Sequence, residues 1–571
     1  MSASVPKREC DLIMKGGVTS GVVYPKAVLR LARDYRFRSI GGTSAGAIAA
    51  AITAAAELNR AGGGFELVAS LPAKLRTSLA SLFQPSPEAR PLFRALGALR
   101  GGAFWPALRI LMFSHAQYLI VALMLFVTLG LFSSAVAGGP FGVLFALIVF
   151  AVGAVLLFGL SVLKSARDVL VEGDFGMCPG TTQEDEEGVG LSDWLAEEIE
   201  AAAGRGLPED PDALRVPLTF GDLERAGIKL RVITTNLGQR RPHVLPELAA
   251  TAAATGEAFY FDPAELRRVV PGWVVDWMTR EGVEPDASGL YPFPAAQDLP
   301  VVLAVRMSLS FPLLIAAVPL HHEAAGHRSR VLFSDGGITS NFPIQFFDAL
   351  LPSRPTFGIA LEPLREEDGR RVRLPMSDPK GAPLGVVPIT GLRAFAATLF
   401  AAAADWHDRL QGTLPGYRER IVTIGLKSGE GGLDLTMSPE AVDAIGALGQ
   451  RAAALLAGGP AESPDDREDF DFDHHRFRRF LVAYMVLEHT LADAAKAWGD
   501  KDDAESFCAF VESRIDDEAY LGGASPEIRR AMVDRFAALM ALAKGWEEKL
   551  AGRPDAAMPG PRPHLRLTPH Y

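Results

Sequence analysis

The segment Phe37–Gly46, with the sequence FRSIGGTSAG, decides the fold class of this chain. Its first residues, Phe37–Ile40, alternate apolar and polar side chains and predict a short strand. Directly after them, Gly42-Thr43-Ser44-Ala45-Gly46 matches the G-x-S-x-G pattern, in which a serine lies on a sharp turn between a strand and a helix. The alanine-rich run Ala45–Leu58 predicts that helix. Strand, turn and helix in this order are the repeating unit of a parallel sheet covered by helices.

Steric crowding explains why glycine occupies both Gly42 and Gly46 in this turn. A Cβ on either side of an exposed serine would collide with the tight turn, whereas glycine leaves room. The serine, Ser44, would then be presented at the edge of the sheet as a nucleophile. An ordinary glycine-rich turn between a strand and a helix is the alternative.

A second glycine loop, Gly16-Gly17-Val18-Thr19-Ser20-Gly21, lies one strand and one helix upstream. Asp11–Lys15 is the expected strand before it, and Val22–Arg33 the expected helix after it. Adjacent parallel strands bring both loops to the same edge of the sheet, where ligands bind in such folds. Backbone N–H groups at the start of a helix suit a developing negative charge. The spacing matches neither a dinucleotide loop nor a P-loop.

A third element is Asp335-Gly336-Gly337, which follows the predicted strand Arg330–Ser334. An aspartate at a strand end can direct its carboxylate along the edge of the sheet and accept the proton of Ser44. The triplet taken alone is also a common turn.

Together these elements resemble the patatin-like phospholipase family, which has a glycine-rich oxyanion loop, a G-x-S-x-G serine and a D-G-G/A aspartate in that chain order. Thr234–Leu237 and Met307–Pro312 also look like family segments, and the resemblance spans roughly residues 10–361. It implies a three-layer α/β/α fold with a mainly parallel sheet, and a lipid acyl hydrolase without a catalytic histidine, metal or cofactor. The resemblance implies a role for each matching residue. Ser44 and Asp335 would be catalytic, and Gly16, Gly17 and Ala45 would donate hydrogen bonds to the oxyanion. Gly42 and Gly46 would form the nucleophile elbow, and Gly336 and Gly337 would support the dyad.

Two features depart from the family pattern: the composition of the glycine loop, and the 291 residues that separate Ser44 from Asp335, a gap that the expected hairpin partly explains. The glycine loop has Val18 and Ser20 where the family has a third glycine and a cation. An aspartate near its ordinary pKa of about 4 is also a weak base. A Ser-Asp-His triad is the competing arrangement, and we disfavour it because the later histidines lie in presumed helices or the tail: His407, His474, His475, His489, His564 and His570. His321, His322 and His327 are expected in a polar loop.

Between Ser44 and Asp335 lies a segment without ionisable side chains, Tyr118–Leu163, interrupted by Gly138-Gly139-Pro140. The two parts, Tyr118–Ala137 and Phe141–Leu163, each reach the about 20 residues that a membrane-spanning helix needs. We therefore expect a transmembrane hairpin, with a buried helical hairpin of a large core as the alternative. The basic residues that flank it predict that both soluble parts face the cytoplasm, in a multi-pass protein of the inner (cytoplasmic) membrane.

The composition limits the partners. The chain has 571 residues, 49% of them hydrophobic, and a net charge of −11. An acidic chain without a basic stripe argues against nucleic acid. Three scattered cysteines argue against a disulfide framework. The expected partners are a membrane phospholipid or another acyl-ester lipid as substrate, and the lipid bilayer.

The rest of the chain predicts further strands and then helices. The expected boundaries are a patatin-like first part at 1–104, the hairpin insert at 105–168, a second part with Asp335 at 169–425, and a helical C-terminal region at 426–571. Expected strands are Lys229–Thr235 and Thr356–Leu361, and expected helices are Leu303–Leu309, Phe342–Leu351, a helix beginning at Ser438, Arg476–Trp498 and Pro526–Leu550. Leu392–Trp406 is apolar enough to cover the site or lie on a membrane, although core packing is favoured.

Two functions from different classes follow. The first is a membrane-anchored lipid acyl hydrolase that cleaves carboxylic esters with a Ser–Asp dyad. The alternative is a catalytically weak or inactive membrane-bound module that binds acyl lipids or a protein, which Ser20 in place of the cation would support. A channel is disfavoured because the apolar segment holds no ionisable residue.

Overall fold

The computed structural model describes residues 6–17, 20–78, 80–117, 120–121, 124, 127–128, 140–208, 210, 213–364, 369–375, 386, 389–427, 430, 437–458, 470–499, 507–515 and 524–549. Every structural statement below concerns these residues. Val18, Thr19, Gly138, Gly139 and the tail histidines lie outside them.

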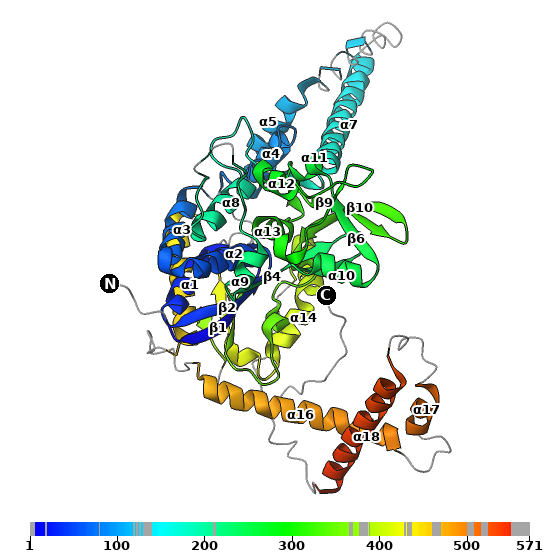
Figure 1. Ribbon diagram of the computed structural model, residues 1–571. Helices are drawn as coiled ribbons and strands as arrows, with labels where there is room; N and C mark the ends of the chain where they lie inside the picture. Colours follow the sequence, from blue (N-terminus) through cyan, green and yellow to red (C-terminus); the bar gives the residue numbers. More distant parts are fainter. Residues whose placement is uncertain are drawn as a thin grey trace.

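A mixed α/β unit with a large, mainly parallel sheet forms the body of the molecule (Figure 1). Its centre has five parallel strands in the order β13, β11, β1, β2 and β4. Their bounds are β1 (Arg8–Met14), β2 (Tyr35–Gly42), β4 (Lys229–Asn236), β11 (Thr356–Pro363) and β13 (Ile421–Leu426). The predicted α/β class with a mainly parallel sheet is therefore confirmed.

The sheet continues beyond β4 as an antiparallel wing. The strand β10 (His327–Asp335) pairs antiparallel with β4, and β9 (Val318–Ala324), β6 (Glu257–Phe261) and β7 (Tyr291–Pro292) follow. Two short strands pair antiparallel elsewhere, β5 (Arg241–Leu245) with β4 and β12 (Val372–Arg373) with β13. The predicted polar loop at His321–His327 is wrong, because His321 and His322 belong to β9 and His327 begins β10. A separate parallel pair joins β3 (Gly176–Cys178) and β8 (Leu313–Ile315).

Both faces of the central strands are buried, as expected for a parallel sheet covered by helices. Leu12 and Met14 of β1 pack into the largest hydrophobic cluster. Ile13, which points to the other face, packs with Phe342 and Ile344 in a second cluster. The alternation of side chains along β1 thus separates two cores.

The helices that pack on this sheet mostly agree with the predicted ones. The helices around the site and the core are α1 (Tyr24–Ala32), α2 (Ala45–Leu58), α3 (Gly64–Ser78), α8 (Leu191–Ala202), α13 (Val301–Ser308), α14 (Leu392–Thr413) and α15 (Pro439–Leu456). The predicted helix Phe342–Leu351 is wrong: only a 3-10 turn, Ile344–Phe347, forms there. Pro343 has no N–H to donate, and the carboxylate of Asp408 accepts the N–H of Phe342 over 2.8 Å, so the chain is held in a turn.

The predicted transmembrane hairpin is corrected by the structure. No helix among the described residues is both long and apolar enough to cross a membrane. The helix α7 (Pro140–Glu172) runs without interruption from the charge-free segment into Lys164, Arg167 and Asp168, and its Val169 is buried in a small cluster with Ala89 and Met177. The absence of charge over part of a helix therefore did not identify a spanning element. The predictions of a multi-pass inner-membrane protein and of transmembrane helices are withdrawn with it.

The helices α4 (Arg90–Arg100), α5 (Phe104–Ser114) and α7 project from the body as an arm (Figure 1). At the opposite end, α16 (Phe472–Gly499), α17 (Phe507–Arg514) and α18 (Pro526–Lys549) extend away from the sheet (Figure 1). The helix α15 does not belong to that extension. It packs against α1, and a Cβ on its Gly449 would lie 2.1 Å from the carbonyl oxygen of Val23. The predicted domain boundaries stay predictions.

Candidate active site

The turn between β2 and α2 holds Ser44 in a strained backbone conformation. Ser44 has φ 55° and ψ −127°, a region that side chains rarely adopt. A Cβ on Gly42 would lie 2.3 Å from the carbonyl oxygen of Gly46, and one on Gly46 would lie 2.2 Å from the carbonyl oxygen of Met14. Because both obstacles are backbone atoms, only glycine fits at either position. The predicted strand–turn–helix geometry is therefore present, and Ser44 begins an observed helix that spans Ala45–Leu58, as predicted.

The second dyad residue, Asp335, ends β10 and is buried. Its Oδ1 accepts the N–H of Gly337 over 2.7 Å. Burial raises the pKa of Asp335 to about 6, while hydrogen bonds from the Ser44 side chain and the Gly337 N–H act in the opposite direction. Oδ2 of Asp335 is buried and accepts no hydrogen bond from the described residues, so it is available as an acceptor for the Ser44 hydroxyl. The structure thus brings Ser44 and Asp335 together.

The raised pKa alters the expectation drawn from an ordinary aspartate. A carboxylate with a pKa near 6 is a better proton acceptor at neutral pH than one near 4, and it is still ionised there. Gly336, directly after Asp335, allows the end of β10 to lie close to β4. A Cβ on Gly336 would lie 2.1 Å from the carbonyl oxygen of Ile233, so β10 could not approach β4 with any other residue there.

The predicted oxyanion donors differ in their availability. The N–H of Ala45 has no acceptor in the described part of the chain, and it lies beside Ser44 at the start of α2. The N–H of Gly16 donates to the carbonyl oxygen of Asn341 over 3.0 Å. A Cβ on Gly16 would meet Asn341 Oδ1 at 2.2 Å and the Thr43 carbonyl oxygen at 2.9 Å, so this loop packs directly on the nucleophile turn. Gly17 lies in the same loop. The assignment of Gly16, Gly17 and Ala45 as oxyanion donors stays a prediction.

A carboxylate from a distant helix holds the chain that follows Asp335. Asp408 of α14 accepts the N–H of Asn341 over 2.7 Å, the N–H of Phe342 over 2.8 Å and the hydroxyl of Ser340 over 3.2 Å. Since Asn341 in turn accepts the N–H of Gly16, α14 reaches both glycine-containing loops of the site. The apolar composition of Leu392–Trp406 predicted core packing, a cover over the site or a membrane contact, but it indicated no role for Asp408.

A five-residue segment, Arg306–Ser310, touches both halves of the dyad, and we call it the clamp segment. Ser308 Oγ accepts the N–H of Ser44 over 3.1 Å. The carbonyl oxygen of Ser310 accepts the N–H of Asp335 over 3.0 Å and the hydroxyl of Ser334 over 2.8 Å. The family-like segment Met307–Pro312 was noticed in the sequence, but no residue in it was given a role.

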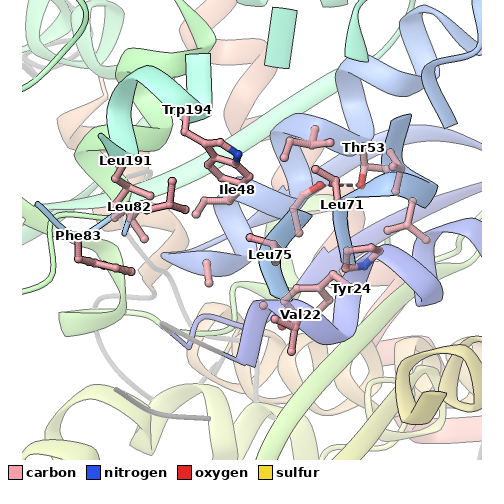
Figure 2. Close-up of a pocket in the computed structure, with 18 residues that line it drawn as sticks. Val22, Tyr24, Ile48, Thr53, Leu71, Leu75, Leu82, Phe83, Leu191 and Trp194 are labelled. Atoms are coloured by element: carbon pink, nitrogen blue, oxygen red, sulfur yellow. Dashed lines mark hydrogen bonds between the residues drawn. The ribbon is translucent and has the colours of Figure 1, made fainter. Parts of the chain in front are cut away.

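An apolar pocket of about 80 Å³ opens beside the nucleophile turn (Figure 2). Gly21 and Ala45, from the two predicted catalytic loops, line it, and Ile48, Ala49 and Ile52 continue it along one face of α2. Phe83, Leu82, Leu191 and Trp194 lie on one side of it and Val22, Tyr24, Leu71 and Thr53 on the other (Figure 2).

The two hydroxyls in this lining are already engaged. Tyr24 donates to the carbonyl oxygen of Lys15, and Thr53 donates to the carbonyl oxygen of Ala49. The pocket therefore offers almost only aliphatic and aromatic carbon to a ligand, and its shape suits an alkyl chain.

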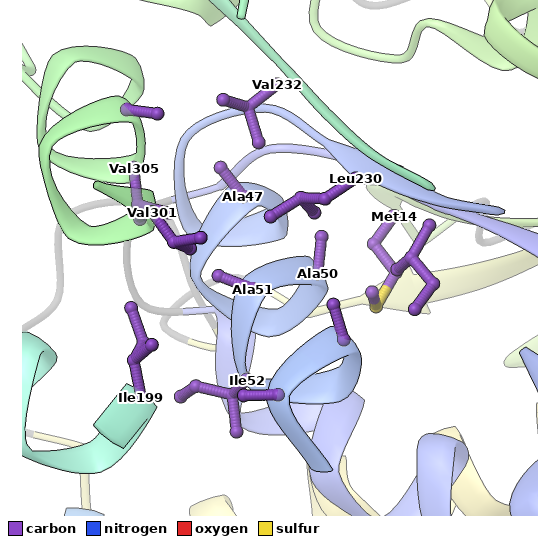
Figure 3. Close-up of a cluster of buried hydrophobic side chains, with 14 of the residues drawn as sticks. Met14, Ala47, Ala50, Ala51, Ile52, Ile199, Leu230, Val232, Val301 and Val305 are labelled. Atoms are coloured by element: carbon purple, nitrogen blue, oxygen red, sulfur yellow. The ribbon is translucent and has the colours of Figure 1, made fainter. Parts of the chain in front are cut away.

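The opposite face of α2 is fixed in the core (Figure 3). Ala47, Ala50 and Ala51 pack between the sheet, through Leu230 and Val232, and α13, through Val301 and Val305 (Figure 3). Small side chains on this face allow α2 to approach the sheet closely, which holds the nucleophile turn rigidly in place.

The histidines that compete as triad members are engaged elsewhere. His475 of α16 is buried against the rings of Phe470 and Phe472, and burial lowers its pKa to about 3. His321 pairs with Glu265, and His322 with Gln239. No described histidine hydrogen-bonds to Asp335 or Ser44.

Comparison with known proteins identifies one relative across the whole length. A scan against models of known protein families finds no match. The chain is 33% identical over 665 aligned residues to the RpoH suppressor of Rhizobium meliloti (strain 1021), with 100% of each chain covered. This chain belongs to the family of that protein. The name of that protein states no chemical activity.

Among solved structures, the chain matches VipD from Legionella pneumophila at 14% identity, over 94% of this chain and 85% of that one. The TM-score is 0.28, so the two backbones share little common geometry.

Proposed function

We propose that this chain is a serine carboxylic ester hydrolase of acyl lipids, with Ser44 as nucleophile, Asp335 as general base and a patatin-like arrangement of the site. The observation that carries the proposal is the placement of Ser44. It lies on a strained turn at the start of a helix, against a buried carboxylate whose pKa is about 6. A strained serine beside a buried base is expected of a nucleophile and has no evident value for stability.

The reaction follows from these positions. Asp335 takes the proton of the Ser44 hydroxyl as Oγ forms a bond to the ester carbonyl carbon, and the carbonyl oxygen becomes an oxyanion. The N–H of Ala45, at the start of α2, can donate to that oxyanion, and the positive end of the helix favours it. Protonated Asp335 then gives its proton to the leaving alcohol as the ester bond breaks. Water, activated by Asp335, cleaves the acyl-serine and releases the acid and free Ser44.

The apolar pocket supports acyl lipids as the substrate class. Ala45 at one end and Thr53 at the other are eight positions apart along α2, or roughly 12 Å at 1.5 Å per residue. A single alkyl chain lying along this face would have its ester next to Ser44. The narrow volume favours one unbranched chain over a bulky ring.

Catalysis is tested with three proteins and a series of p-nitrophenyl esters that differ only in acyl length. The wild type should hydrolyse them, whereas Ser44→Ala and Asp335→Asn should each lose about 10³-fold or more of kcat. A fluorophosphonate probe should label the wild type and not Ser44→Ala. A folded wild type that neither hydrolyses any ester nor takes up the probe would support the non-catalytic binding module instead.

The acyl pocket is tested separately by filling it. Ala49→Phe places a ring in the pocket, so hydrolysis of long-chain esters should fall while hydrolysis of the acetyl ester stays near the wild-type rate. Ala253→Phe, on an exposed face of α10 (Leu248–Ala254), is the matched control and should change neither. An Ala49→Phe variant with unchanged chain-length preference would show that the acyl chain lies elsewhere.

A further inference from the structure

Arg306, at the start of the clamp segment, is a buried cation whose hydrogen-bond partners are all neutral. The side chain is fully buried in the last turn of α13. Nε donates to Ser192 Oγ over 3.2 Å, Nη1 to Ser310 Oγ over 2.5 Å, and Nη2 to the carbonyl oxygens of Pro179 and Ala316 over 2.7 and 2.9 Å. No carboxylate of the described chain is among its hydrogen-bond or ion-pair partners.

Such a placement is costly for folding. A buried charge without a counter-ion loses its hydration, and apolar replacements of buried ionic groups are often neutral or stabilising. Burial lowers the pKa of Arg306 to about 9, so the guanidinium is still charged at neutral pH. Stability alone therefore does not explain an arginine at this position.

The guanidinium joins the clamp segment to a frame outside the dyad. Pro179 and Ala316 follow the paired strands β3 and β8, and Ser192 lies in the first turn of α8 and donates to the carbonyl oxygen of Val269 over 2.7 Å. The planar fork of arginine reaches acceptors on three such elements at once, which an ammonium group on a flexible stem cannot reproduce.

On its other side the guanidinium fixes Ser310. Ser310 Oγ accepts from Nη1 and donates to the carbonyl oxygen of Arg306 over 3.0 Å, so the turn is closed on both sides. The carbonyl oxygen of Ser310 is then held where it accepts the N–H of Asp335, and Ser308 Oγ is held where it accepts the N–H of Ser44.

We propose that Arg306 is a positioning residue that sets the distance between Ser44 and Asp335 by holding the clamp segment against the frame formed by β3, β8 and α8. It touches neither substrate nor the reacting atoms. The inference depends on the proposed function for its kinetic consequence, but the geometry on which it acts can be measured without any activity.

The kinetic experiment compares Arg306→Met and Arg306→Lys with the wild type in the full-length chain, using p-nitrophenyl butyrate and normalising to folded protein. Because a misplacement of about 1 Å can cost 10²-fold, Arg306→Met should lower kcat roughly 100-fold. Arg306→Lys, which keeps the charge and part of the hydrogen bonding, should recover part of that loss, to roughly 10-fold below the wild type. KM should stay within about twofold in both, because Arg306 does not line the acyl pocket and only Leu309 of the clamp segment does.

Arg420→Lys is the matched control. Arg420 is equally buried and donates to Asp348, Gly416 and Thr356, away from the dyad. It should lower the thermal midpoint and leave kcat of the folded protein within about twofold, as expected of a purely structural arginine. Arg306 variants that behave in the same way as Arg420→Lys would overturn the proposal.

Hydrogen exchange separates this inference from the proposed function. The amides of Ser44 and Asp335 should exchange faster in Arg306→Met than in the wild type, while those of β1 and β11 should be unchanged. If the wild type proves inactive towards every ester, the proposed function fails and amide exchange still decides the positioning role. Unchanged protection at Ser44 and Asp335 would reject it.

Discussion

The two halves of the dyad are held in different ways. The turn that carries Ser44 is formed by its own neighbours in the chain, which are β2, two glycines and α2, all within Tyr35–Leu58, and one long-range hydrogen bond, to Ser308 Oγ, holds the Ser44 N–H. Asp335 accepts the N–H of nearby Gly337, and it is otherwise placed by Ser310 of the clamp segment and by the α14 carboxylate of Asp408, which holds the following turn. Ser44 has a strained backbone conformation, whereas Asp335 has a carboxylate whose charged form is destabilised by burial. The proposed dyad thus combines one member on a locally encoded turn with one that depends more on long-range packing.

The largest expected effect tests how rigid the local half is. Gly46→Ala would place a Cβ 2.2 Å from the carbonyl oxygen of Met14, and a backbone atom cannot rotate away. We expect a loss of stability of about 3 kcal/mol or more, together with loss of activity. Urea unfolding followed by circular dichroism measures it. Gly97→Ala in α4, where nothing lies within 4 Å of the added Cβ, is the control and should be neutral or stabilising.

The buried carboxylate of the distant half should make both activity and stability depend on pH. Asp335 acts as a base only when ionised, so kcat/KM should be constant above about pH 7 and should fall tenfold per pH unit below its pKa of about 6. An aspartate with an ordinary pKa would keep its activity down to about pH 4. A pH–rate profile without a limb near 6 would contradict the assignment of Asp335 as the base.

The linked stability change has a definite sign. Since the folded pKa lies above the unfolded value of 3.8, Asp335 contributes stability that is fully present below about pH 3.8 and is lost as the pH rises through about 6. Asp335→Asn avoids that loss, so it should be more stable than the wild type at pH 8 by about 2–3 kcal/mol, with the difference disappearing near pH 4. Denaturant unfolding at both pH values measures this difference.

A smaller effect is expected when Asp408, which holds the turn after Asp335, is replaced. Asp408→Ala leaves the buried N–H groups of Asn341 and Phe342 without their acceptor and loosens the turn that also holds Gly16. We expect kcat to fall roughly tenfold, with a smaller loss in Asp408→Asn, which keeps an acceptor oxygen. Steady-state kinetics on the butyryl ester measures both. Asp534→Ala, at an exposed position of α18, should leave kcat unchanged.

The smallest expected effect on stability concerns the strained backbone of Ser44. Ser44→Gly removes the penalty of a side chain at φ 55° and should raise stability by about 1 kcal/mol while abolishing activity. Ser44→Ala keeps the Cβ and should abolish activity without that gain. Equal stability of the two variants would show that the turn is not strained.

Much of the fold and half of the site could be predicted from local sequence. The strand before Ser44, both elbow glycines and the bounds of α2 follow from patterns within a few residues, and the structure agrees with them. Asp335 could be predicted as a candidate, but the strand arrangement that brings it to Ser44 could not. The strand β10 runs antiparallel to β4, so Asp335 enters the site from the antiparallel wing and not from a parallel strand end.

The errors have a common physical origin. The charge-free segment predicted a membrane hairpin because charge is a local property, whereas the helix that contains part of it continues into a charged and partly buried section. The apolar spacing of Phe342–Leu351 predicted a helix because spacing carries no information about a carboxylate that arrives from α14. Nothing in the sequence distinguishes Arg306 from the other arginines, since burial is a property of the folded chain.

The sequence by itself therefore determined where the strained turn lies and which residue it presents, because the G-x-S-x-G pattern, the strand before it and the helix after it all lie within Tyr35–Leu58. Only the tertiary structure decided what faces that serine. A carboxylate with a pKa near 6, an arginine with neutral partners and an apolar pocket along α2 all arise when segments hundreds of residues apart exclude water from one place. Desolvation of this kind depends on the packing of the whole chain and cannot be read from any short stretch of it.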